Sequence, residues 1–65
     1  MKARMKDNLI ARYKAILPLE YDDEVGAFLT SIEGKTVELV FIGGDAFEKN
    51  DNNYWLPNEL WEEAK

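Results

Sequence analysis

The sequence predicts a mainly β fold: one small domain of five strands in a closed or nearly closed sheet, with a short C-terminal helical turn. Three observations support this fold. Residues 36–41 alternate between two faces of a pleat, as in a strand. Residues 50–52, Asn-Asp-Asn, are of the types that favour a tight turn. With 65 residues there is room for one core only, and closing the sheet would leave no exposed strand edge.

The central strand is the clearest element. It begins after Gly34 and ends at the glycine pair Gly43 and Gly44, which tolerates the positive φ of a tight turn. One face carries three apolar side chains that we expect to point into the core: Val37, Leu39 and Phe41. This strand is the element on which the others pack or pair.

Residues 8–17 fit two periods. A period of two gives a strand, whereas a period of 3.6 places Leu9, Tyr13 and Ile16 on one stripe of a helix. We predict a strand because Pro18 follows directly and no capping residue opens a long helix, with the helix as the alternative. After a solvated acidic loop, residues 25–33 form either a short strand or one helical turn.

A hairpin is predicted near the C-terminus. Residues 46–49 and 53–57 flank the tip at 50–52, and Pro57 ends the second strand because it lacks an N–H for the ladder. Asn58 then has the character of an N-cap, so residues 59–64 are expected to form a short helical turn.

Two of these segments resemble parts of SH3-like small barrels. Residues 33–40 resemble the strand that follows the long first loop, and residues 55–61 resemble the closing segment, in which a strand ends at proline, makes a 3₁₀ turn and re-enters the sheet. The resemblance implies one SH3-like domain over residues 1–65, with 1–7 a flexible basic arm. In size and style the chain is also similar to small uncharacterised proteins of phages and prophages, which implies a phage or prophage origin.

Composition limits the classes of function. The chain has no cysteine and no histidine, which excludes disulfides, the usual Cys/His zinc sites and Cys-His or Ser-His nucleophile pairs. Its hydroxyls have no partner base, so we expect no enzyme and no cofactor. The acidic residues 20–24 lack the ligand spacing and the glycine of a calcium loop, so we expect no metal site. No apolar run approaches the ~20 residues of a membrane span, and no secretory apolar segment follows the N-terminal basic residues. We therefore expect a cytoplasmic protein.

Charge is distributed unevenly along this acidic chain. The net charge is -5, of which residues 1–14 contribute five basic residues against one acid, +4, and residues 15–65 contribute three lysines against twelve acids, -9. Such an acidic body repels nucleic acid and is suited to a partner of opposite charge.

The leading expectation is therefore a non-catalytic interaction module, an adaptor or inhibitor that binds another protein, with a second copy of the chain as one alternative partner. Its expected binding surface is the aromatic segment near the C-terminus: Tyr54, Trp55, Pro57, Leu60 and Trp61. The other interpretation of the tryptophans is that they close the core. The alternative function is a nucleic-acid-associated module that uses the basic N-terminal residues Lys2, Arg4, Lys6, Arg12 and Lys14.

Overall fold

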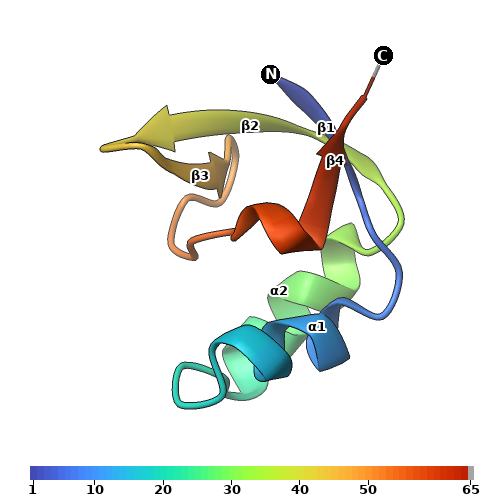
Figure 1. The fold of residues 1–65 in the computed structure, drawn as a ribbon, viewed down its shortest axis with the longest axis vertical. Helices are drawn as coiled ribbons and strands as arrows, with labels where there is room; N and C mark the ends of the chain where they lie inside the picture. Colours follow the sequence, from blue (N-terminus) through green and yellow to red (C-terminus); the bar gives the residue numbers. More distant parts are fainter. Residues whose placement is uncertain (65) are drawn as a thin grey trace.

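The structure, a computed structural model, describes residues 1–64 (Figure 1). Two helices lie on one side of a small antiparallel sheet. The elements in chain order are β1 (Lys2–Met5), α1 (Leu9–Ile16), α2 (Asp23–Ile32), β2 (Thr36–Ile42), β3 (Asp45–Glu48), a 3₁₀ turn (Asn58–Leu60) and β4 (Trp61–Glu63). Within residues 1–64, no helix is long and apolar enough to cross a membrane.

The sheet is open, which makes the predicted five-stranded SH3-like barrel wrong. Its four strands, counted over residues 1–64, have the order β3-β2-β1-β4, and every neighbouring pair is antiparallel. Residues 8–17, predicted as a strand, are mostly helical, and so are residues 25–33, for which the sequence allows a short strand as one of two alternatives. Residues 53–57 contribute one isolated bridge, Trp55 to Phe47, in place of the predicted strand. The segment 1–7, expected to be a flexible basic arm, contains β1, an inner strand of the sheet.

Residues 8–17 form helix α1, so the predicted strand is wrong and the helical period is the correct one. Leu9 and Tyr13 lie one turn apart and are both buried. The side chain of the N-cap residue, Asn8, makes no capping hydrogen bond to the first turn of this helix. The Glu33 carboxylate accepts a hydrogen bond from the Leu9 amide instead, at 2.9 Å. Pro18 ends this helix because it restricts Leu17 to a non-helical conformation.

Helix α2 begins where the sequence is most acidic. The Asp22 side chain accepts a hydrogen bond from the Val25 amide at 2.9 Å, which caps the helix, and Asp23 and Glu24 lie in its first turn, where the helix dipole favours acids. Its buried apolar side chains recur at helical spacing: Val25, Phe28, Leu29 and Ile32. The predicted solvated loop therefore ends at a helix. Of residues 25–33, expected to form either a short strand or one helical turn, all but the last belong to this longer helix.

The central strand and its turn are as predicted. β2 spans Thr36–Ile42 and forms a hairpin with β3 through Gly43 and Gly44, both of which have positive φ. The inner face of the sheet and the two helices enclose one core. It contains Ala3, Met5, Leu9, Tyr13, Val25, Phe28, Leu29, Ile32, Leu39, Ala46, Leu56 and Leu60.

The C-terminal segment differs from the predicted helical turn over 59–64. Residues 58–60 form one 3₁₀ turn, and the chain then enters the sheet as β4, paired with β1. The turn brings the Leu60 side chain into the core, with none of its surface exposed. A 3₁₀ turn followed by a strand is what the resemblance implied for this segment, although the sheet that β4 joins is open.

Candidate functional site

One end of the sheet projects past the helices. Leu39 and Phe41 point to the same face of β2, yet 2% of Leu39 is exposed and 52% of Phe41. A hollow of about 300 Å³ lies at this uncovered end. We call it the aromatic groove; three rings, Phe41, Trp55 and Trp61, line it over a floor that includes Ala46 and Leu56. Ile42, on the opposite face beside the turn, is also 53% exposed.

Backbone and side-chain contacts hold the groove in shape. The Leu56 amide donates to the Ala46 carbonyl oxygen at 2.9 Å, which fixes the segment that carries Trp55 against β3. The Trp61 indole N–H donates to the Leu56 carbonyl oxygen at 3.0 Å. The Phe41 and Trp61 rings meet edge to face, with centroids 6.4 Å apart. The indole N–H of Trp61 is therefore satisfied within the fold, and Trp55, 40% exposed, is the more available tryptophan.

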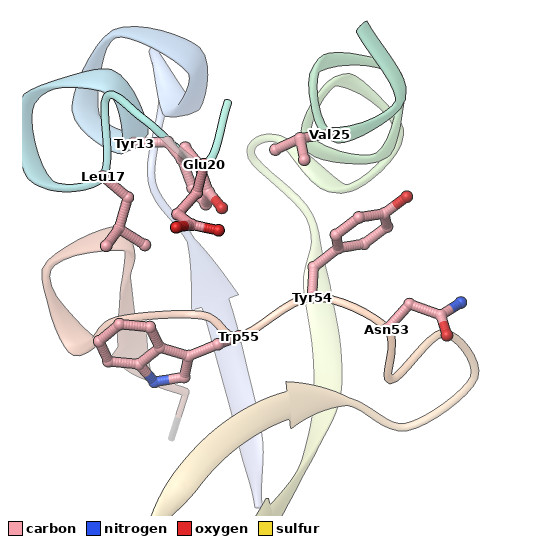
Figure 2. Close-up of a pocket in the computed structure, with 7 residues that line it drawn as sticks. All are labelled: Tyr13, Leu17, Glu20, Val25, Asn53, Tyr54 and Trp55. Atoms are coloured by element: carbon pink, nitrogen blue, oxygen red, sulfur yellow. The ribbon is translucent and has the colours of Figure 1, made fainter. Parts of the chain in front are cut away.

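A second hollow, of about 400 Å³, lies on the other side of Trp55, between the helices and the 53–55 segment (Figure 2). We call it the aromatic-acidic pocket; it is lined by Tyr13, Leu17, Glu20, Val25, Asn53, Tyr54 and Trp55. In Figure 2 the Glu20 carboxylate extends into the hollow from the helical side, and Trp55 and Tyr54 lie on the segment across from it. The two hollows adjoin at Trp55, which lines both, and together they are the candidate binding surface.

The two tyrosines of this pocket have raised pKa values. Burial raises the pKa of the Tyr13 hydroxyl most, and the nearby carboxylates of Glu20 and Asp22 raise it further. Desolvation likewise raises the pKa of Tyr54, and Glu24 adds the next largest effect. Both phenols therefore remain neutral at physiological pH and lie in a negative electrostatic field.

Three of the five residues predicted for the binding surface line these hollows: Tyr54, Trp55 and Trp61. The other two, Pro57 and Leu60, are buried, because the 3₁₀ turn directs this segment into the core. Sequence reasoning missed Phe41, which it placed in the core. It also missed Tyr13 and Glu20 as lining residues of a pocket. The Phe41 exposure has no local signal, since it depends on where the helices end.

The basic residues of the alternative function are placed on several elements. Lys2 and Arg4 lie in β1, where Lys2 is opposite Glu38 and Arg4 forms an ion pair with Glu62 at 3.4 Å. Arg12 and Lys14 lie on α1. The Arg12 guanidinium donates to the Asp7 carbonyl oxygen, and the Lys14 ammonium lies 4.5 Å from the centroid of the Tyr21 ring. Lys6 follows β1 and is half-buried.

The described part of the chain, residues 1–64, has no group of three or more Asp or Glu side chains placed to hold a metal ion. A scan of protein-family models, a search of curated proteins and a search of solved structures each found no match to this chain. A function therefore has to be inferred from the geometry of the two hollows and the charges around them.

Proposed function

We propose that this chain is a non-catalytic module that binds another protein through the surface centred on Trp55. The aromatic groove and the aromatic-acidic pocket meet at this side chain, which is 40% exposed in a chain whose other tryptophan is hydrogen-bonded in the fold. An exposed tryptophan between two hollows is typical of a binding hot spot, because aromatic anchors that fill pockets dominate interface energies.

Burial and charge both favour a protein partner. Half-exposed Phe41 and Trp55 leave apolar surface in water that docking would remove. The net charge of -5 favours a basic surface on the partner, since complementary charge speeds and orients encounter. Adaptor and inhibitor are both consistent with this mode of binding.

Site-specific photo-crosslinking in cells of the source organism tests the proposal. p-Benzoylphenylalanine is placed at position 41 or 55, and at Lys35 as the control. Lys35 is an exposed residue in the α2–β2 connection, at the opposite end of β2 from Phe41, and it lines neither hollow. We expect one protein to be crosslinked from positions 41 and 55 and not from position 35.

Equal crosslinking from all three positions, or none from positions 41 and 55, would contradict the proposal. A crosslinked product of twice the mass of the chain would identify the partner as a second copy. Sedimentation at several concentrations would then have to show a dimer that Trp55→Ser weakens.

A further inference from the structure

The aromatic-acidic pocket differs from the groove in its chemistry. Its seven lining residues include three aromatic rings, two aliphatic side chains and one acid, and none is basic. Its volume of about 400 Å³ is within the range of roughly 300–1,000 Å³ seen for sites that enclose small ligands. Rings and aliphatic walls with a carboxylate among them suit a ligand with an apolar stem and a cationic head.

Tyr13 contributes a polar group to the wall of the pocket. The residue as a whole is only 4% exposed, and it lines the hollow. Within residues 1–64, no buried side-chain oxygen or nitrogen is left without a hydrogen-bond partner, so this hydroxyl is not an orphaned buried group. In Figure 2, Tyr13 and Glu20 both extend from the helical side toward the hollow. A donor or acceptor is therefore available inside the pocket for a polar group that enters from outside.

The electric field in the pocket selects for positive charge. Desolvation is the largest cause of the raised pKa of its two phenols, and several carboxylates raise each pKa further: Glu20 and Asp22 for Tyr13, and Glu24, Asp51 and Asp22 for Tyr54. A field that opposes a phenolate stabilises a cation at the same place. The chain already has one such contact next to the pocket, where the Lys14 ammonium lies over the Tyr21 ring. That ring is 6.3 Å from the Tyr13 ring, centroid to centroid.

We propose that the aromatic-acidic pocket binds the side chain of an arginine from the partner protein. This inference rests on the proposed function and specifies the chemistry of the partner. The planar guanidinium can stack on the Trp55 or Tyr54 ring and donate two parallel hydrogen bonds to the Glu20 carboxylate. Its methylene groups contact the aliphatic side chains of Leu17 and Val25. A lysine ammonium matches the charge but cannot form the stacked, two-point contact.

The probe is the pentapeptide acetyl-Gly-Gly-Arg-Gly-Gly-amide, titrated into the ¹⁵N-labelled full chain. The two indole N–H signals separate the two hollows, because Trp55 lines both whereas Trp61 lines only the groove and donates to the Leu56 carbonyl oxygen. We expect a saturable shift of the Trp55 indole signal with little change at Trp61. The lysine peptide should bind more weakly, and the citrulline peptide, which has the same shape without the charge, should give no saturable shift.

Glu20→Gln is the decisive variant, because Glu20 is exposed and its substitution leaves the core intact. We expect its affinity for the arginine peptide to fall at least tenfold. Glu63→Gln is the matched control: it removes one exposed carboxylate from β4, outside the pocket, and should change affinity less than twofold. Equal losses in the two variants, equal binding of the citrulline peptide, or no saturable shift would overturn the inference.

The two proposals fail separately. If crosslinking from positions 41 and 55 succeeds but the arginine peptide does not bind, the interaction module stands and the arginine pocket is wrong. If the peptide binds through Glu20 but crosslinking yields no protein partner, the pocket is correct and the proposed function is wrong.

Discussion

The two ends of the inner face of β2 differ in what covers them. At one end Leu39 packs under the helices in the core, and two residues further along the same face Phe41 projects beyond them toward Trp55 and Trp61. Both side chains are large and apolar, and the alternation of the strand predicts that both are buried on the same face. The covered end therefore holds the fold together, whereas the uncovered end leaves apolar side chains available for the proposed binding.

The largest effect is expected from removing the apolar side chain at the covered end, with the same substitution at the uncovered end as its counterpart. Leu39→Ala should lower the free energy of unfolding by about 2–5 kcal/mol, because it leaves a cavity in the core. Phe41→Ala should lower it by less than about 1 kcal/mol, since the ring is half exposed and leaves no enclosed cavity. Urea unfolding followed by circular dichroism measures both. Equal losses would show that the two ends are equally covered.

Helix α2, which helps to cover the core end of the sheet, is stabilised by its N-cap residue, Asp22. Asp22→Ala should lower the free energy of unfolding by about 1 kcal/mol, because the Val25 amide loses its hydrogen-bond acceptor. Asp23→Ala is the matched control: it removes an exposed acid from the first turn that makes no cap hydrogen bond, and about 0.3–1 kcal/mol is expected. A larger loss from Asp23→Ala than from Asp22→Ala would contradict the assigned cap.

Alkaline pH should destabilise the fold by ionising the two tyrosines of the aromatic-acidic pocket, Tyr13 and Tyr54. The pKa values of Tyr13 and Tyr54 are raised on folding, so their contribution to stability is complete below the unfolded pKa of about 10 and is lost as pH rises through the folded values. Urea unfolding at increasing pH measures the decline, and phenolate absorbance follows the ionisation. Tyr13→Phe with Tyr54→Phe should flatten the decline; an unchanged profile would contradict the assignment.

The smallest signal is expected in a test of binding between this chain and duplex DNA. The basic side chains Lys2 and Arg4 face acids across the strands, and the chain is acidic overall. We therefore expect no binding of duplex DNA in fluorescence anisotropy even at low salt, where such contacts are strongest. Binding that falls steeply with added salt would show instead that the N-terminal basic residues form a functional surface.

The elements with local signals were predictable from the sequence. The alternation of β2 and the positive φ of Gly43 and Gly44 follow from residue type alone. Helix α2 also had a readable signal, the i, i+3, i+4, i+7 spacing that begins at Val25 after the Asp22 cap. Gly26 obscured this signal. A Cβ there would clash with the Tyr21 hydroxyl, so glycine leaves room for that side chain at the expense of helix propensity.

Other features depend on contacts between distant parts of the chain. The first turn of α1 is capped by Glu33, from the far end of α2, so no local pattern around Leu9 could reveal it. In the site, the sequence leaves open whether Trp55 is exposed or closes the core, and the burial of Leu60 follows from the 3₁₀ turn. Glu20 lies across the pocket from Trp55 only because of the folded conformation of the loop between the helices, which no local sequence pattern specifies.

The exposure of the uncovered end can be measured directly on the free protein with a soluble paramagnetic gadolinium chelate, which broadens NMR signals near the surface. The ring signals of Phe41 and Trp55 should broaden strongly, while the methyl signals of Leu39 and Leu60 stay sharp. Phe41 and Trp55 signals as protected as those of Leu39, at every protein concentration, would show that this end of the sheet is covered and offers no binding surface.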